Sequence, residues 1–160
     1  MSERLDIRLA TVTEAEDIAL ESMAEIEHNL HWSWTPQRVR KAMADAETNV
    51  AVALEEGKVI AFGIMEYKDN LAHLLLFAVR EDARRRGVGS SLLRWLEQVA
   101  RVAGVAHFKV EARRDNAAAL AFYRKHGYCK RLAVTGMYQG TEDGIRLEKG
   151  GDTVMEERDA

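Results

Sequence analysis

Residues 71–103 have the sequence LAHLLLFAVREDARRRGVGSSLLRWLEQVARVA. Residues 71–79 are apolar except for His73, which is typical of a central strand covered on both faces. From Leu92 onward apolar residues recur every three or four positions, which predicts a helix over residues 88–103 that ends before Gly104. The rest of the fold can be placed around this unit of strand, arginine- and glycine-rich loop, and helix.

Apolar periodicity predicts the other elements. We expect strands over residues 5–10, 49–54, 59–67, 107–112, 129–138 and 145–148, and helices over residues 14–28, 36–45 and 116–126. Thr13 with Glu16 matches a capping box, and Thr35 before Pro36 matches a helix start. Parallel pairing is expected only where a helix separates two strands. The fold class is α/β, with a single mixed, mostly antiparallel sheet of about seven strands flanked by about four helices.

Composition limits the classes of protein to consider. Hydrophobic residues make up 47% of the 160 residues, which suits one globular domain over residues 1–148 with a polar tail, expected to be flexible, at 149–160. The net charge of −3 argues against binding of nucleic acid by bulk charge. The absence of an apolar run of about 18 residues or a secretory signal favours a cytoplasmic protein without a membrane span. No metal site is expected, because His28 and His31 lack a third ligand at zinc spacing.

The loop Arg84-Arg85-Arg86-Gly87-Val88-Gly89-Ser90 combines three features of an anion site. A helix N-terminus presents unpaired N–H groups, glycines allow close approach, and arginines supply forked donors for phosphate. A Walker A loop would need Gly-Lys-Ser/Thr, and a dinucleotide fingerprint would need a small residue at Leu92. A solvated basic turn is the remaining alternative. We predict a pyrophosphate site.

Two blocks within residues 79–128 occur in the order and spacing of one enzyme family. The Arg-x-x-Gly-x-Gly loop follows a central strand, and residues 116–128 (NAAALAFYRKHGY) match the pattern Asn-x-x-Ala-x-x-x-Tyr-x-x-x-Gly-Phe/Tyr. Both resemble the GNAT superfamily of N-acetyltransferases, over about residues 5–148. The resemblance implies an acyl-CoA N-acyltransferase-like fold. It also implies transfer of acetyl from acetyl-CoA to a primary amine of a small molecule, amino acid or peptide, by direct attack on the thioester.

The resemblance also implies roles for matching residues. The backbone of Ala78 and Val79 would pair with the pantetheine arm like an added strand. Asn116 would bind pantetheine or cap its helix. Tyr123 would be the general acid, since a phenol is a neutral donor at pH 7, although it could instead pack in the core. The cofactor-binding set is Ala78, Val79, Arg84, Arg85, Arg86, Gly87, Val88, Gly89, Ser90, Asn116 and Tyr123.

An attacking amine must lose a proton, so a general base is expected. Glu111 is the first candidate, because Val110-Glu111-Ala112-Arg113 resembles the Leu-Glu-Val-Arg of ribosomal-protein N-terminal acetyltransferases, in which that glutamate is the base. Strand alternation places Glu111 on the same face as Lys109, and an ion pair with Lys109 or an arginine is the structural alternative. His73 could accept the proton instead, although a lone histidine in an apolar strand is more often a core residue.

The first helix and the loop after it are expected to form the acceptor side. The candidate substrate-binding residues are Glu27, His31, Trp32, Trp34 and His73, and Glu27, His28 and His31 are further candidates for the base. Indole faces attract cations, although both tryptophans could instead pack the loop on the sheet. The expected partners are acetyl-CoA and an amine, and the terminal hairpin could pair across a homodimer. A non-catalytic acyl-CoA sensor is the alternative function.

Overall fold

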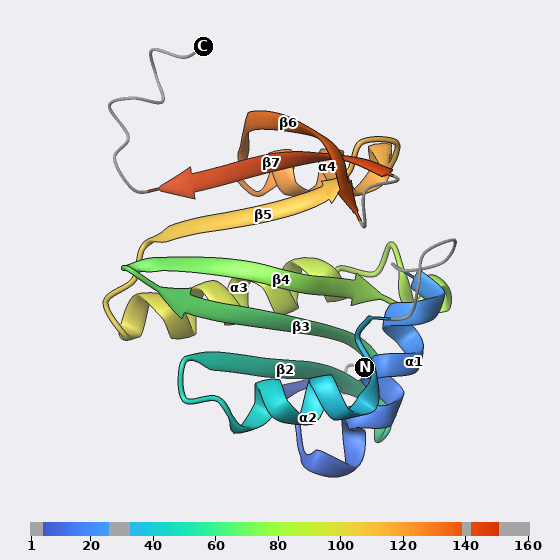
Figure 1. The fold of residues 1–160 in the computed structure, drawn as a ribbon. Helices are drawn as coiled ribbons and strands as arrows, with labels where there is room; N and C mark the ends of the chain where they lie inside the picture. Colours follow the sequence, from blue (N-terminus) through green and yellow to red (C-terminus); the bar gives the residue numbers. More distant parts are fainter. Residues whose placement is uncertain (1–4, 26–32, 139–141, 151–160) are drawn as a thin grey trace.

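The computed structural model describes residues 5–25, 33–138 and 142–150. Within these ranges, seven strands form one sheet in the order β1-β2-β3-β4-β5-β7-β6, and four α-helices flank it (Figure 1). The strands are β1 (Leu5–Leu9), β2 (Thr48–Glu55), β3 (Lys58–Lys68), β4 (Leu71–Val79), β5 (His107–Arg113), β6 (Cys129–Tyr138) and β7 (Glu142–Gly150). The helices are α1 (Ala15–Glu25), α2 (Pro36–Ala44), α3 (Val88–Val102) and α4 (Ala117–Lys125). The predicted fold class is confirmed.

The first helix starts differently from the prediction. The capping box is formed by Thr11 and Glu14 at the 3₁₀ turn that precedes α1, not by Thr13 and Glu16. The Glu14 carboxylate accepts from the Thr11 N–H at 2.8 Å and from the Arg8 guanidinium at 2.7 and 3.0 Å. Two Thr-x-x-Glu patterns overlap here, and the ion pair with β1 favours the earlier one.

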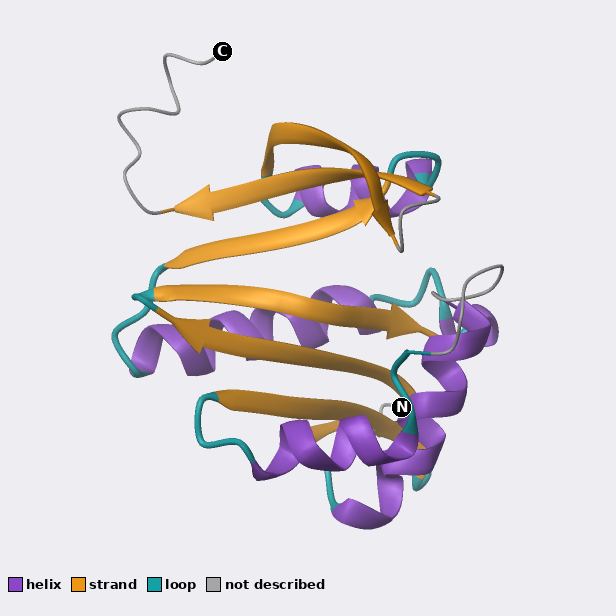
Figure 2. Cartoon of the chain, viewed as in Figure 1, coloured by secondary structure: helices purple, strands orange, loops and turns teal. Residues whose placement is uncertain are grey.

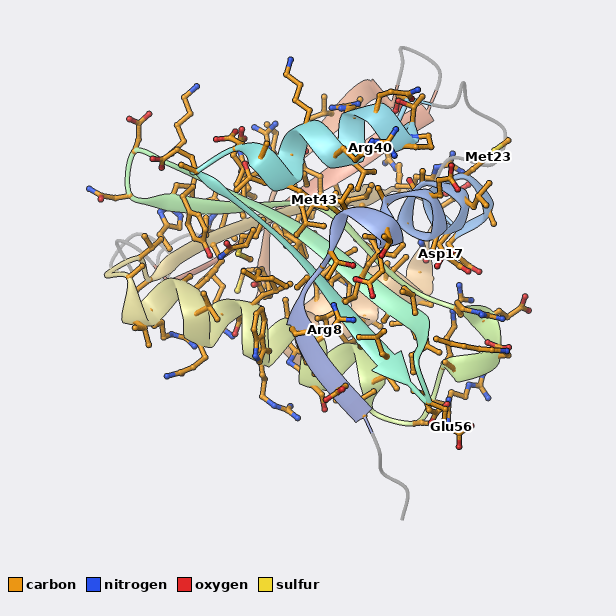
Figure 3. All side chains as sticks on the ribbon, turned by 90° about the horizontal axis from the view of Figure 1, so that it is seen from below. Arg8, Asp17, Met23, Arg40, Met43 and Glu56 are labelled. Atoms are coloured by element: carbon orange, nitrogen blue, oxygen red, sulfur yellow. The ribbon has the colours of Figure 1, made fainter. Side chains whose placement is uncertain are left out.

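The helices cover the sheet on both faces. Helices α1 and α2 lie over β2 to β4 on one face, and α3 and α4 lie on the other (Figures 1 and 2). Seen from below, the sheet separates α1 and α2 from α3 (Figure 3). Each face has its own buried apolar cluster. None of the helices in the described ranges is long and apolar enough to cross a membrane.

Strands β4 and β5 are the parallel pair, joined through α3 as the helix rule predicted. Their ladder is short, because only residues 72–74 pair with residues 108–110. The strands then diverge toward their C-terminal ends (Figure 1). The β5-facing edge of residues 75–79 therefore has no ladder partner in β5.

A β-bulge in β4 lies where the β4–β5 ladder ends. Ile64 of β3 pairs with Leu76, whereas the next residue, Met65, pairs with Leu74. Leu75 is therefore an extra residue on β4. A bulge of this kind re-aims the side chains of a strand.

The bulge changes which helices the side chains of β4 meet. Ala72 and Leu74 belong to the core beneath α3, whereas Leu76 and Ala78 belong to the core beneath α1 and α2. By alternation, His73 lies on the α1 and α2 face. Alternation carries side chains of this apolar strand into both cores, as its composition predicted, and the bulge decides which positions each core receives.

The end of the sheet is anchored by a buried carboxylate on α3. Glu97 is 2% exposed and accepts from the Tyr128 hydroxyl at 2.6 Å and from Lys149 Nζ at 2.9 Å. Burial, together with this carboxylate, raises the pKa of Tyr128 above its ordinary range. Strand β7 thus extends through Lys149 and Gly150, the first two residues of the predicted tail.

Candidate active site

Helix α3 begins without a side-chain cap. Gly87 occupies the N-cap position with φ 80°, and no side chain caps the helix. The first backbone bond runs from Ser91 N–H to Gly87 O at 3.0 Å, and the N–H groups of residues 88–90 have no acceptor in the part of the chain that the structure describes. In contrast, α2 and α4 are capped by Thr35 and Asn116. Three unpaired N–H groups at a helix start form an anion site.

The two glycines of the loop serve different purposes. A Cβ at Gly87 would meet no atom within 4 Å, so the space before the helix is open. A Cβ at Gly89 would lie 3.2 Å from Val79 Cγ2 and 3.4 Å from the Phe122 ring. Gly89 therefore allows α3 to pack against β4 and α4, which is a role that the motif alone did not predict.

The three arginines of the loop differ in their partners. Arg84 forms an ion pair with Glu25 at the end of α1. Arg86 donates two bonds to Glu55 at 3.0 and 3.1 Å, which lowers the pKa of that carboxyl group. Arg85 has φ 66° and forms no hydrogen bond or ion pair with a described residue. Arg85 is therefore the cation that remains available for a phosphate.

The end of β4 and the start of α4 contain the other residues expected to hold the cofactor. Ala78 and Val79 pair with β3 on one side only. The Val79 carbonyl also accepts from Arg84 Nε at 3.0 Å, which leaves one lone pair of that oxygen for another donor. Asn116 Oδ1 accepts from the Ala119 N–H at 3.0 Å and so acts as the helix cap.

Glu111 and His73 meet where β4 and β5 begin to diverge. Glu111 Oε2 accepts from Arg146 at 2.9 Å (Nε) and 2.8 Å (the terminal nitrogen). Glu111 Oε1 lies 3.4 Å from His73 Nε2, a buried nitrogen that has no hydrogen-bond partner within the described ranges. The interaction with His73, followed by the bonds from Arg146, outweighs burial and lowers the pKa of Glu111 to about 2. Glu111 is therefore ionised at neutral pH.

Tyr123 lies on the opposite face of the sheet. Its side chain is 6% exposed and belongs to the core beneath α3. Ring centroids of Phe77, Phe122 and Tyr128 lie 6.3, 5.4 and 5.7 Å from that of Tyr123. The candidate acid and the candidate base thus approach the diverging strands from opposite faces.

The sequence profile of the acetyltransferase (GNAT) family matches residues 12–128, which include the uncapped helix start and Tyr123. The chain belongs to this family. It is an N-acetyltransferase, and acetyl-CoA is its cosubstrate.

Relatives of this GNAT enzyme include the [ribosomal protein bS18]-alanine N-acetyltransferase of Escherichia coli K12, which is 30% identical over 135 residues, 84% of this chain and 90% of that protein. The crystal structure of the ribosomal-protein-S18-alanine N-acetyltransferase from E. coli has a TM-score of 0.76 at 26% identity, covering 92% of this chain and 97% of that one. The fold is shared by the PaiA N-acetyltransferase of Thermoplasma acidophilum, solved in complex with coenzyme A. Its TM-score is 0.75 at 17% identity, covering 93% of this chain and 100% of that one.

The expected acceptor residues of this GNAT enzyme are only partly described. Glu27, His28, His31 and Trp32 lie outside the described residues. Trp34 is 8% exposed, and the Arg38 guanidinium lies 3.8 Å from its ring centroid. Trp34 therefore packs in the core with one indole face covered. No group of three His, Cys, Asp or Glu in the described residues is arranged to hold a metal ion.

Sequence reasoning missed Arg146, the residue that holds Glu111. The two residues are 35 positions apart and become cross-strand partners only through the β5–β7 register. The sequence indicates an arginine as one alternative partner but does not identify which arginine. Alternation could have placed Arg146 on a polar face, but only the register shows which residue it opposes.

Proposed function

We propose that this GNAT enzyme acetylates the α-amine of a polypeptide N-terminus. Support comes from the bS18-alanine N-acetyltransferase, which aligns with 84% of the chain. An α-amine has a pKa of about 7.7–8.0, whereas a lysine amine has one of about 10.4, so the α-amine loses its proton more readily at neutral pH. The face of β5 that carries Glu111 is not covered by α1 or α2 (Figure 1), which suits an extended acceptor.

In this proposal the cofactor site is built from α3, β4 and α4. The N–H groups of residues 88–90 and the Arg85 guanidinium hold the pyrophosphate. The free edge of Ala78 and Val79 pairs with the pantetheine arm, and Asn116 has its amide nitrogen left for the same arm. The fit is supported by the open space beside Gly87, where a Cβ would meet no atom within 4 Å. Acetyl-CoA supplies the activated acetyl group.

The observation that carries the proposed chemistry is the His73–Glu111 pair, with 3.4 Å between Nε2 and Oε1. A carboxyl group with a pKa of about 2 is a weak base at neutral pH. We assign the proton of the attacking amine to His73, and Glu111 stabilises the imidazolium that results. Arg146 keeps the carboxylate ionised and oriented. In this proposal Glu111 is therefore the partner of the base and not the base itself.

Tyr123 is the proposed general acid on the other face. The amine nitrogen forms a bond to the carbonyl carbon, the carbon–sulfur bond breaks, and the Tyr123 hydroxyl protonates the departing sulfur. The product is an amide and a free thiol. Close packing of Tyr123 against Phe77 and Phe122 limits the positions that its hydroxyl can take.

The test is an acetyl-CoA assay that records free thiol and corrects for hydrolysis. The acceptors are peptides with a free N-terminus, the same peptides with the N-terminus formylated and one lysine retained, free amino acids and polyamines. We expect turnover of the free N-terminal peptides and background rates with the formylated ones. Preferred turnover of polyamines or free amino acids would show that the acceptor is a small molecule.

A further inference from the structure

Ser90 and His126 connect the cofactor loop to the end of α4. Ser90 lies in the first turn of α3, and its N–H is one of the three that have no acceptor among the described residues. Its hydroxyl oxygen lies 2.8 Å from His126 Nε2. His126 is the C-cap residue of α4, and its ring centroid lies 4.7 Å from that of Phe122. The imidazole therefore reaches the proposed pyrophosphate site through one intervening hydroxyl.

Charged groups from three elements surround His126. Burial lowers its pKa and outweighs Glu97, which raises it, while nearby cations lower it further. These charged groups are Glu97 and Arg94 on α3, Lys149 on β7 and Lys125 on α4. The imidazole is therefore neutral near pH 7 and carries one N–H, which can be on either ring nitrogen.

The two tautomers have opposite effects on Ser90. If Nε2 is bare, it accepts the Ser90 proton, and the hydroxyl presents only lone pairs to an anion. If Nε2 carries the proton, it donates to Ser90 Oγ, and the hydroxyl proton is left for a phosphate oxygen. A protonated imidazole can only donate, so the charged form also gives the second arrangement.

We propose that His126 is a positioning residue for the pyrophosphate of coenzyme A and acts through the Ser90 hydroxyl. His126 Nε2–H donates to Ser90 Oγ, and the Ser90 hydroxyl donates to a phosphate oxygen. This inference rests on the proposed role of the α3 N-terminus as the pyrophosphate site. Because the phosphate is anionic, its binding favours protonation of His126. Cofactor binding therefore takes up protons and strengthens as the pH falls.

The test uses calorimetric titration of 3′-dephospho-coenzyme A into the full-length enzyme at several pH values between about 5.5 and 8. This probe retains the pyrophosphate but lacks the 3′-phosphate, whose own ionisation near about pH 6 would confuse the result. Buffers with different ionisation enthalpies report the proton uptake. The variants are His126→Leu, which removes the donor, and His126→Gln, which keeps a neutral donor. Ser90→Ala and Ser91→Ala form a matched pair, since only Ser90 contacts His126.

We expect His126→Leu and Ser90→Ala to raise the Kd of the probe about tenfold, with no further loss in the double variant. His126→Gln should keep most of the affinity but lose the proton uptake, and Ser91→Ala should match the parent. Acetyl-pantetheine, which lacks the pyrophosphate, should keep its kcat/KM in every variant.

Two results would overturn the role of His126. One is a probe Kd in His126→Leu within about twofold of the parent value. The other is an equal loss of acetyl-pantetheine kcat/KM, because that would indicate general disturbance of α4. Failure of the peptide-acceptor proposal would appear separately, in the acceptor assay, and would leave these Kd values unchanged. Failure of the parent enzyme to bind the probe would instead reject the pyrophosphate site itself.

Discussion

Replacing Glu111 with glutamine removes the ionised carboxylate between His73 and Arg146. The carboxyl pKa falls from an ordinary 4.5 to about 2, which corresponds to roughly 3 kcal/mol of folding free energy at about 1.36 kcal/mol per pKa unit. The side chain is 22% exposed, so screening makes this an upper value. Because the pKa is lowered, the contribution is complete above about pH 4.5 and disappears as the pH falls through about 2.

Urea unfolding of the parent and of Glu111→Gln at pH 7, 5, 4 and 3 measures this contribution. We expect the variant to be less stable by about 2–3 kcal/mol at pH 7, with the difference shrinking below about pH 4. Glu56→Gln removes the same charge at the exposed β2–β3 turn and controls for net charge. A stability difference between parent and variant that stays constant with pH would refute the argument that the ionised form of Glu111 stabilises the fold.

The same variant tests the chemical role of Glu111. If Glu111 stabilises an imidazolium on His73, its loss should lower kcat and move the acidic limb of the pH–rate profile to lower pH. If Glu111 were itself the proton acceptor, kcat would fall without that displacement. An unchanged kcat and an unmoved limb would remove Glu111 from the mechanism.

Further substitutions test the acid, the packing of α3 and the phosphate cation. Tyr123→Phe should lower kcat by about 10²–10⁴ with little change in the KM for acetyl-CoA, and an unchanged turnover number would exclude Tyr123 as the acid. Gly89→Ala should displace α3 from Val79, where the added Cβ would lie at 3.2 Å, and should destabilise the fold by about 1–3 kcal/mol in thermal unfolding. Arg85→Met should raise the calorimetric Kd of coenzyme A about tenfold, whereas Arg86→Met should have a smaller effect because Arg86 is already paired. Equal losses in both arginine variants would contradict the assignment of Arg85.

Local patterns were sufficient for most of the fold. The limits of β4 match the prediction, residues 71–79, and α3 ends at residue 102 rather than 103. Phe108 and Val110 are buried, while Glu111 lies on the other face of β5, as alternation indicated. These features depend on side-chain period and on chain breakers such as Gly104, which act between near neighbours.

The family and its chemistry were also accessible from the sequence. The Arg-x-x-Gly-x-Gly loop and the Asn116 to Tyr128 block each combine residues that are close in the chain, so their spacing is preserved in the printed sequence. The family match over residues 12–128 confirms this interpretation. The roles of Tyr123 and Glu111 remain predictions.

Other features depend on register and on contacts between distant segments. The extra residue at Leu75 is visible only when β3 is aligned with β4, and it decides the face that each side chain of β4 meets. Arg146 reaches Glu111 only because β7 is hydrogen-bonded to β5 in one register. Shifting that register by one residue would turn Arg146 to the other face.

The arginine loop also combines features that the sequence determines with features that depend on contacts between distant segments. By itself the sequence determined that three arginines and two glycines precede a helix, and hence that an anion is favoured there. Only the tertiary structure decided that Glu25 and Glu55 pair with two of those arginines. It also decided that His126 lies within hydrogen-bond distance of Ser90. Charges are neutralised by whatever lies within a few ångströms, and those neighbours come from helices and strands far away in the chain.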